Sequence, residues 1–339
     1  MNQTVGVSIT GVGHALPSQT EDNETLCRNL DVTPEWILEK TGIRRRYLAR
    51  PEEHASDYAT RAAEQALKMA GIAPEAIGLI IVCTFSGDYI FPPVSAKVQQ
   101  NLAARKAQIF DLQANCSGFV TGLTVASDRL KSDPDLGHAL VIGVEMNSRY
   151  INRSDVNSAI YMSDGAGAAV LSCADPGEGI MASAFYTDSS NFEAVRMRGG
   201  GSSFPLTAQT PFDPTVDFME MNGIATWKQA ITHLPRVIRI ACEKSGVSPT
   251  DVDFLIFHQA NFKMIEYIVK KMGYGLEKTF TNVEEIGNTG AASVGIALSE
   301  AVSGGHLRKN QTVVIAAVGA GFNFAASVWR WTLDIRHPS

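Results

Sequence analysis

The sequence has 339 residues, of which 45% are hydrophobic and 19% are charged, with a formal net charge of −6. A chain of this size can bury one large hydrophobic core or two medium ones. The acidic balance argues against binding to nucleic acid or to an anionic membrane, although a local basic patch could still bind an acidic partner. No signal-peptide pattern and no apolar run of membrane-spanning length is present, so we expect a cytoplasmic protein.

The five cysteines are odd in number, scattered and without C-x-x-C spacing: Cys27, Cys83, Cys116, Cys173 and Cys242. This pattern predicts neither disulfides nor a metal site. Cys83 and Cys173 fall in apolar strands, where they are expected to be small buried side chains.

The first half of the chain alternates between strand and helix patterns. Thr33 before Pro34 is typical of a helix N-cap with proline at the first helical position. Gly71 is expected to end the strongest helix of this half. In chain order we expect strand 5–12, helices 21–30, 34–40 and 56–70, strand 79–84, helix 94–104, strand 108–112, a helix from Cys116 through Leu130, and strands 139–144 and 168–173.

Residues 174–222 change character, because Gly, Ser, Pro and Thr become frequent. We expect this segment to connect two halves of the protein and to form part of a surface or mouth. After it the pattern predicts helix 223–246, strand 252–257, helix 261–272, a short strand 279–282, helix 291–303 and strands 311–317 and 325–331.

A βαβαβ pattern occurs twice with similar spacing. Strand 79–84 matches 253–258, and strand 139–144 matches 313–318, at a common offset of 174 residues. The same offset relates Cys116 to Gly290, which stands beside Asn288. We therefore predict an α/β fold of two pseudo-symmetric halves, residues 1–174 and residues 175–339, with 175–222 as the connection. The strand ends of both halves would converge on one site.

Cys116 lies where a strand passes into a helix, in the segment Phe110–Leu123. Unpaired backbone N–H groups and the positive end of the helix dipole are found at such a position. Both favour thiolate over thiol, and the thiolate is the nucleophile. We therefore expect a reactive cysteine with a lowered pKa.

The second half supplies complementary chemistry. His258 follows an apolar strand, Asn288 precedes a helix of small residues, and Ala320 lies in the glycine-rich turn of Val318-Gly-Ala-Gly-Phe322. This set suits acyl transfer through a thioester on Cys116, with the backbone N–H groups of Cys116 and Ala320 holding the tetrahedral oxyanion. His258 and Asn288 could both donate to one further oxygen, such as the thioester carbonyl of a decarboxylating malonyl group. No acidic triad member is apparent.

Each of these residues also has a structural explanation when taken singly. A cysteine at such a turn is often only packed, a strand-end histidine is often a satisfied polar residue, and Asn288 alone would be an N-cap. Their occurrence together at repeat-related turns favours catalysis. A dinucleotide site is disfavoured, because the segment from Gly11 lacks the third glycine and the segment from Gly165 follows the wrong element order.

Five motifs resemble those of the β-ketoacyl-ACP synthase III family of the thiolase superfamily. They cover essentially the whole chain and occur in order: Glu-Trp-Ile-x-x-Lys-Thr-Gly-Ile-x-x-Arg at 35–46, Asn-Cys-Ser-Gly-Phe at 115–119, Asp-Gly-Ala-Gly-Ala-Ala-Val at 164–170, His-Gln-Ala-Asn at 258–261 and Gly-Asn-Thr-Gly-Ala-Ala-Ser at 287–293.

The resemblance implies a thiolase-like five-layer αβαβα fold, a homodimer and a catalytic triad of Cys116, His258 and Asn288. It implies transfer of an acyl group from acyl-CoA or acyl-ACP to Cys116, then decarboxylative Claisen condensation with malonyl-ACP or malonyl-CoA. No cofactor is expected beyond the CoA and phosphopantetheine thioesters that serve as substrates.

The resemblance also implies binding residues. Trp36 would stack near the CoA adenine, and Lys263 with the basic segment 44–46 would face phosphopantetheine or the acyl carrier protein. Phe91 is similar to a family residue that reaches the acyl pocket of the dimer mate. Lys40 stands where arginine is frequent, and Ala320 replaces the middle one of three glycines. Neither Arg149 nor Arg153 aligns cleanly with the loop arginine that grips the nucleotide.

Two other roles stay open on the sequence. The chain could be a specialised-metabolism ketosynthase or acyltransferase of the same fold, acting on an unusual acyl or β-keto substrate. It could also be an idle subunit that only shapes a partner's pocket. The presence of Cys116 argues against the idle subunit, and the intact Cys–His–Asn set favours decarboxylative condensation.

Overall fold

The computed structural model describes residues 5–207 and 211–334. Its first half contains β1 (Gly6–Ala15), β2 (Gln19–Asp22), α1 (Asn23–Leu26), α2 (Pro34–Thr41), β3 (Arg45–Leu48), α3 (Ala55–Ala70), β4 (Ile77–Cys83), α4 (Val94–Leu102), β5 (Gln108–Leu112), the 3-10 turn η3 (Asn115–Ser117), α5 (Gly118–Ser132), β6 (His138–Met146), η5 (Asn147–Arg149), α6 (Val156–Ala159) and β7 (Asp164–Ala174).

The second half contains β8 (Gly179–Thr187), η6 (Ser189–Ala194), β9 (Val195–Arg196), α7 (Pro214–Asp217), β10 (Glu220–Met221), α8 (Gly223–Ser245), β11 (Phe254–Phe257), α9 (Phe262–Lys271), β12 (Thr279–Phe280), α10 (Val283–Ile286), η9 (Gly290–Ala292), α11 (Ser293–Ser303), β13 (Thr312–Gly319) and β14 (Asn323–Arg330). Thr33 caps α2 as predicted, because its hydroxyl accepts the Trp36 N–H at 3.2 Å.

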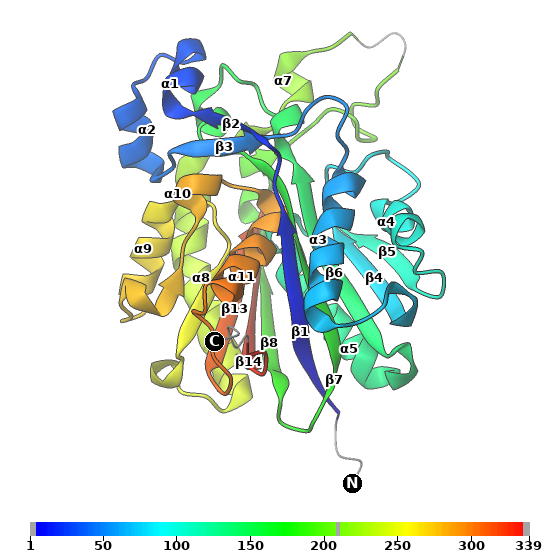
Figure 1. The fold of residues 1–339 in the computed structure, drawn as a ribbon. Helices are drawn as coiled ribbons and strands as arrows, with labels where there is room; N and C mark the ends of the chain where they lie inside the picture. The colour runs from blue at the N-terminus through cyan, green and yellow to red at the C-terminus, as the bar shows by residue number, and fades with distance from the viewer. Residues whose placement is uncertain (1–4, 208–210, 335–339) are drawn as a thin grey trace.

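The main sheet has the order β12-β11-β13-β14-β8-β1-β7-β6-β4-β5 (Figure 1). From the centre of the sheet outward, the strands of the first half follow the order β1, β7, β6, β4 and β5. Those of the second half follow the order β8, β14, β13, β11 and β12, so each strand of one half has a counterpart in the other. Within the main sheet the halves join where β1 runs parallel to β8, with Val7 paired with Gly179. The predicted pseudo-symmetric α/β architecture is confirmed.

Alternate residues of the strands face different cores, which establishes the layers. On β4, Leu79 and Ile81 face a central core that also holds α5 and α11, whereas Ile80 and Val82 face α3 and α4. On β13 the odd-numbered residues face the same central core and the even-numbered ones face α8 and α9. Five layers therefore follow: α3 and α4, one half-sheet, α5 and α11, the other half-sheet, and α8 and α9 (Figure 1).

Three local expectations were wrong. The segment expected to connect the halves, which includes residues 208–210 outside the described part, contains the sheet strand β8. Its Ala- and Ser-containing sequence gave no apolar alternation, and pairing with β14 supplies the stability instead. The helix expected at 21–30 begins as the end of β2, which pairs with β3. Cys173 is exposed near the end of β7, whereas Cys83 is buried as expected.

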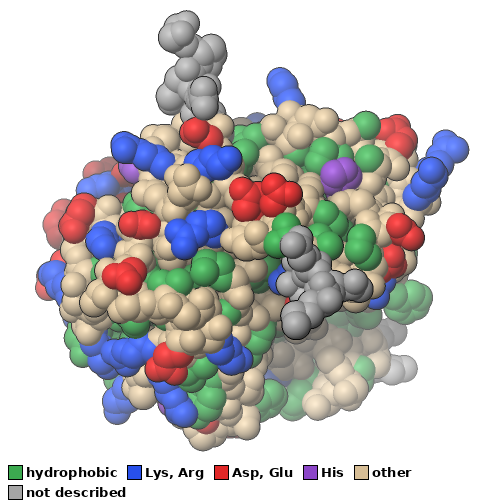
Figure 2. Space-filling view, turned by 90° about the horizontal axis from the view of Figure 1, so that it is seen from below, with side chains coloured by type: hydrophobic (Ala, Val, Ile, Leu, Met, Phe, Trp, Pro, Cys, Tyr) green, Lys and Arg blue, Asp and Glu red, His purple; other side chains and the backbone are tan. Residues whose placement is uncertain are grey.

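The carboxyl ends of β4, β6, β11 and β13 lie at one end of the molecule, because these strands run parallel within each half. The opposite end, where β1 begins, carries basic and acidic side chains interspersed with one another (Figure 2). Among the described residues, no helix is long and apolar enough to cross a membrane.

Candidate active site

The two central helices begin with matching turns. Cys116 lies in η3 ahead of α5, and η9 leads in the same way into α11. A Cβ placed on Gly118 would lie 3.7 Å from the Cβ of Ala291, so the two turns pack against one another. The repeat therefore brings the cysteine turn of one half to the Asn288 turn of the other.

The thiol of Cys116 is not lowered in pKa, which corrects the expectation from the helix N-terminus. Burial raises its pKa to about 12, and the negative charge of Glu145 adds to the rise. Desolvation of the thiolate thus outweighs the helix dipole. Although part of the residue stays accessible, the resting nucleophile is a thiol.

His258 follows β11 and is buried. Its Nδ1 lies 2.6 Å from the hydroxyl of Ser293, the first residue of α11. Burial lowers its pKa to about 4, so the imidazole is neutral at pH 7. The Ser293 oxygen also accepts the Gln259 N–H at 3.3 Å. In the tautomer whose Nδ1 accepts the Ser293 hydroxyl proton, the ring proton sits on Nε2, where the imidazole can donate a hydrogen bond.

Asn288 is also buried, and its backbone is fixed on both sides. Its N–H donates to the Tyr161 carbonyl at 2.8 Å, and its carbonyl accepts the Ser163 N–H at 2.9 Å. Its side-chain oxygen accepts the Gly290 N–H at 2.9 Å. With Oδ1 occupied in this way, the amide Nδ2 is the group left to donate into the site.

Two backbone donors are available beside the cysteine. In the described part of the chain, the N–H groups of Cys116 and Ala320 donate to no backbone carbonyl. The Ala320 carbonyl accepts from the Asn115 side chain at 3.1 Å, which ties its turn to the cysteine turn. Gly319 packs closely there too, since a Cβ on it would lie 2.5 Å from the Ala114 carbonyl oxygen. The turn that holds Ala320 therefore packs against the cysteine turn.

Sequence reasoning missed one acidic residue at this centre. Glu145, near the end of β6, is fully buried, and its charge is felt by Cys116. The expected strand stopped at Val144, one residue before Glu145, whereas β6 extends to Met146. A lone acidic residue at the end of an apolar strand was the only signal that could have revealed it.

The expected binding residues Trp36, Lys40 and Lys263 lie on adjoining elements. The Lys40 ammonium stands 5.9 Å from the centre of the Trp36 ring, both on α2. The Lys40 carbonyl accepts from the Asn261 side chain at 3.2 Å, and Asn261 caps α9, where Lys263 is exposed. Lys40 in the last turn of α2 and Lys263 in the first turn of α9 therefore lie at adjoining helix ends, and Trp36 lies one turn before Lys40.

The basic segment 44–46 does not act as one surface. Arg44 is exposed but pairs with Glu285 at 2.9 Å, and Arg45 pairs with the same carboxylate at 2.6 Å. Arg46 is fully buried, where its guanidinium donates to the Asn23 side chain and the Ile160 carbonyl. Strand alternation turns Arg46 inward, so it is unavailable to a carrier protein.

The two candidate loop arginines are also engaged. Arg149 donates to the backbone carbonyls of Arg50 and Pro51 at 3.1 and 3.3 Å, and to that of Glu53. Arg153 forms an ion pair with Glu21. Neither guanidinium is therefore free for a nucleotide without giving up these contacts.

Phe91 lies on the exposed loop between β4 and α4. It is 83% exposed, and its neighbours Tyr89 and Ile90 are 71% and 87% exposed. In a single chain its side chain is therefore largely open to solvent.

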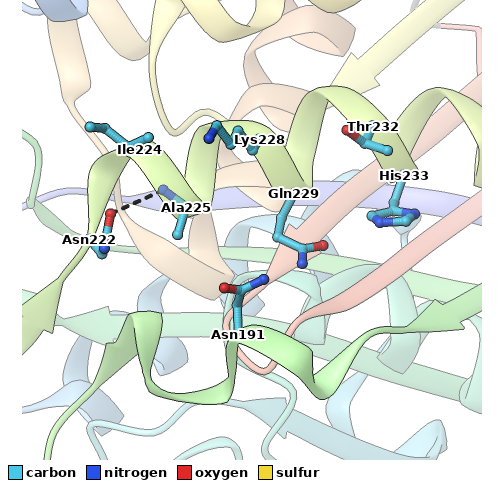
Figure 3. A pocket seen from close by; sticks show the side chains of 8 residues that line it. All are labelled: Asn191, Asn222, Ile224, Ala225, Lys228, Gln229, Thr232 and His233. Atoms are coloured by element: carbon cyan, nitrogen blue, oxygen red, sulfur yellow. Dashed lines mark hydrogen bonds between the residues drawn. The ribbon is translucent and has the colours of Figure 1, made fainter.

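A cavity of about 420 Å³ opens elsewhere, beside the start of α8. Figure 3 shows its lining side chains on α8 and on the segment that carries Asn191. They are Asn191, Asn222, Ile224, Ala225, Lys228, Gln229, Thr232 and His233. None of them belongs to the cysteine, histidine or asparagine turns, so this cavity is distinct from the candidate active site.

Comparison with known families places the chain among condensing enzymes. Residues 110–189 match the family described as 3-Oxoacyl-[acyl-carrier-protein (ACP)] synthase III, and residues 242–331 match its C-terminal part. The chain is 38% identical over 96% of its length to beta-ketoacyl-[acyl-carrier-protein] synthase III of Symbiobacterium thermophilum, covering 98% of that protein. It is 37% identical to the enzyme of the same name from Erythrobacter litoralis, with 96% of this chain and 100% of that one covered.

Solved structures are similar throughout their length. The crystal structure of 3-oxoacyl-[acyl-carrier-protein] synthase III from Aquifex aeolicus superposes with a TM-score of 0.89 at 33% identity, covering 96% of this chain and 100% of the other. The priming β-ketosynthase of the R1128 polyketide pathway superposes with a TM-score of 0.90 at 29% identity, covering 98% of each chain.

Proposed function

The chain belongs to the β-ketoacyl-ACP synthase III family, and on that premise we propose that it carries out a two-step condensation on Cys116. The family membership makes it an acyltransferase-type condensing enzyme with the thiolase fold. The observation that supports this site is the meeting of Cys116, the His258–Ser293 pair and the Asn288–Gly290 pair at the matching turns. Acyl-CoA is the proposed donor and malonyl-ACP the proposed extender.

In the first step the Cys116 sulfur attacks the thioester carbonyl of acyl-CoA. The carbon–sulfur bond to CoA breaks, and the proton of the cysteine thiol ends on the CoA thiol. The N–H groups of Cys116 and Ala320 would hold the oxyanion of the tetrahedral intermediate, which neutral donors can do without adding charge. Because the resting thiol holds its proton, acylation depends on substrate binding to drive proton loss.

In the second step the malonyl thioester carbonyl accepts hydrogen bonds from His258 Nε2 and Asn288 Nδ2. Decarboxylation leaves an enolate that these two donors stabilise. The enolate carbon attacks the acyl group and expels the Cys116 thiolate, which regains a proton. The raised cost of charging the imidazole keeps His258 in its neutral, donating form. No metal or other cofactor is needed, so activity should survive chelation by EDTA.

Mass measurement of the intact protein tests the first step. Incubation with acyl-CoA should add one acyl group, and Cys116→Ala should abolish the adduct. Release of carbon dioxide from malonyl-ACP tests the second step. An adduct without carbon dioxide release would show simple acyl transfer, and no adduct from any CoA or carrier-bound donor would contradict the enzymatic proposal. A series of acyl-CoAs of rising length, scored by adduct mass, would define the acyl group.

Trp36, Lys40, Lys263 and Arg44 are proposed to bind the thioester carrier. Trp36 has a half-buried ring beside a cation, and its remaining exposed part could stack on adenine. Lys263 lies at the start of the adjoining helix α9. Arg44 already forms an ion pair with Glu285, so its guanidinium would have to contact Glu285 and the carrier at the same time. Lys263→Glu should raise KM for malonyl-ACP more than it lowers kcat. An unchanged KM would remove Lys263 from the proposed surface.

A homodimer is proposed from the exposed apolar loop and the edge strand β5. Tyr89, Ile90 and Phe91 form a contiguous exposed apolar segment, and β5 ends the sheet with one unpaired edge. Phe91 would then reach the acyl pocket of a second copy. Light scattering should give twice the chain mass, and Phe91→Asp should weaken the dimer or alter acyl-length preference. A monomeric wild type at micromolar concentration would contradict this arrangement.

A second role, priming of a polyketide chain, has its own support in the similarity to the R1128 priming ketosynthase. The chemistry on Cys116 would be the same, and the acyl group and the carrier protein would differ. Condensation rates with fatty-acid and polyketide carrier proteins distinguish the two roles.

A further inference from the structure

The turn that carries Ala320 is held from two sides. It joins β13 to β14. On one side the Asn115 side-chain amide donates to the Ala320 carbonyl at 3.1 Å. On the other side Phe322 and Asp188 exchange two backbone hydrogen bonds, of 2.8 and 3.0 Å. The position of the Ala320 N–H therefore depends on Asp188 as well as on the cysteine turn.

The pair of Asp188 with Phe322 ends the ladder between β8 and β14. It follows directly after the pair of Thr187 with Asn323, and beyond it the chain leaves the sheet at η6. The end of a ladder opens more readily than its middle, because it has neighbours on one side only. A contact that holds Asp188 in place therefore also holds the turn of Ala320.

Helix α8 supplies that contact. Oδ2 of Asp188 accepts the side-chain N–H of the buried Gln229 at 3.0 Å, while Oδ1 accepts the Ser190 N–H at 2.9 Å. Nε2 of His233 lies 3.5 Å from the same Oδ2. Figure 3 shows Gln229 and His233 on consecutive turns of α8. Two side chains of α8 thus face one carboxylate oxygen of Asp188.

His233 also covers the cross-strand pair that lies two residues before the end of the ladder. The centre of its ring lies 4.9 Å from that of Tyr186 on β8 and 5.2 Å from that of Phe324 on β14. Tyr186 and Phe324 are partners in the ladder. Helix α8 therefore packs over the end of the ladder and binds its last residue.

We propose that Asp188 is a positioning residue for acylation, and that Gln229 of α8 holds it in place. This role rests on the proposed function, in which the Ala320 N–H stabilises the oxyanion formed when Cys116 attacks the thioester. Such a donor is effective because it is already in place when the charge develops. A misplacement of about 1 Å can cost about a hundredfold in rate. A looser turn would therefore slow acylation and leave the reactivity of the thiol itself unchanged.

Two reactions of the same sulfur test the proposal. Acylation by acyl-CoA passes through an oxyanion, whereas alkylation by iodoacetamide displaces iodide without forming one. Gln229→Met keeps a side chain of similar length and removes its N–H donor. The variant should acylate about ten- to a hundredfold more slowly than the wild type and should alkylate Cys116 at the wild-type rate. Peptide mass follows both reactions, with the acyl-CoA that labels the wild type fastest.

Thr232→Val is the matched control. Thr232 lines the same cavity as Gln229 and makes no hydrogen bond to Asp188 within the described ranges, so both rates should stay unchanged. Asp188→Ala should slow acylation at least as much as Gln229→Met. Asp188→Asn keeps one acceptor oxygen and should recover part of that rate. The double variant of Asp188→Ala with Gln229→Met should be no slower than Asp188→Ala alone, because both changes remove the same contact.

A contact that only stabilises the fold predicts a different result. It would lower the urea midpoint of Gln229→Met and leave both rates of the folded protein intact, or slow acylation and alkylation in parallel, and either outcome would overturn the proposal. If Gln229→Met does not fold, the two rates of Asp188→Asn decide in the same way. A wild type that no acyl-CoA labels would contradict the proposed function and this role together, whereas a labelled wild type and equally fast variants would contradict this role alone.

Discussion

The turns that begin α5 and α11 share one backbone shape and differ in chemistry. In the structure Asn115, rather than Cys116, corresponds to Gly290, because the two turns are offset by one residue more than the strands predicted. Both residues have positive φ, 49° and 57°. Gly290 has no room for a side chain because Glu145 fills the space behind it. Asn115 has that room and uses its side chain to bind the Ala320 carbonyl. The repeat thus fixes the backbone, and the neighbours of each turn decide which side chain it can carry.

The difference also explains the division of labour. The first turn carries the sulfur that we propose accepts the acyl group, at the residue that corresponds to Ala291 in the second. The second turn has Asn288 before it and Ser293, which lies beside His258, after it. In the proposed mechanism one copy of the motif binds the covalent intermediate, and the other stabilises developing charge.

Substitution at the two turns should break the activity in different steps, and this is the largest expected effect. Cys116→Ala should abolish acylation altogether. Asn288→Ala and His258→Ala should reduce decarboxylation by about two to three orders of magnitude, the usual effect of removing an oxyanion donor, and spare acylation more. Intact mass and carbon dioxide release measure the steps separately. Equal loss of both steps in the Asn288 or His258 variant would refute the division.

Substitution of the positive-φ residue in each turn should lower the free energy of unfolding by different amounts. Gly290→Ala places a Cβ in the left-handed region, which costs about 1–2 kcal/mol, and forces Glu145 to move. Asn115→Gly keeps the backbone shape and loses one hydrogen bond, worth about 1 kcal/mol. Urea unfolding should therefore show a larger loss for Gly290→Ala. Equal losses would mean that Glu145 does not confine the second turn.

Ser293→Ala tests whether the second turn orients His258. The variant removes the hydroxyl at 2.6 Å from Nδ1, which should slow decarboxylation about five- to tenfold, the effect of one hydrogen bond of about 1 kcal/mol. Acylation of Cys116 in the same preparation serves as the reference step. An equal slowing of acylation would point to a general disturbance of the site.

The pH dependence of decarboxylation should be mild on the acid side. His258 has a lowered pKa, so its neutral form persists well below the ordinary value of 6.5 and is lost only as the pH approaches about 4. Rates from pH 5 to pH 7 should therefore be nearly constant for acylated enzyme with malonyl-ACP. A half-maximal rate near pH 6.5 would show that the imidazole is solvated during turnover.

The sequence predicted the repeat well, because buried parallel strands and small-residue helices leave strong patterns. It failed where neighbours distant in the chain decide the outcome. Burial of the thiol by two turns raises the pKa of Cys116, whereas the local helix dipole alone would lower it. The strand β8 is stabilised by pairing with β14, and its own sequence has no pattern that predicts a strand.

Charged residues were the other source of error. Arg46 stands in the short strand β3 and Glu145 near the end of the long apolar strand β6, and both are fully buried. Each is satisfied by groups from other elements, Asn23 and Ile160 for the arginine, Ser86 and Thr84 for the glutamate. A single sequence shows the charge and does not show such partners.

The single strand pair at the centre of the sheet suggests a use for this protein as a split reporter. Gly179 meets Val7 there with φ of 77°, and a Cβ on it would lie 1.8 Å from the Val7 carbonyl oxygen. Two residues earlier, Gly177 stands in an open turn with no atom near its missing side chain. A chain cut at that turn would leave the thiol on one fragment and the imidazole and carboxamide on the other. Condensation activity would then report that the two fragments had reassociated.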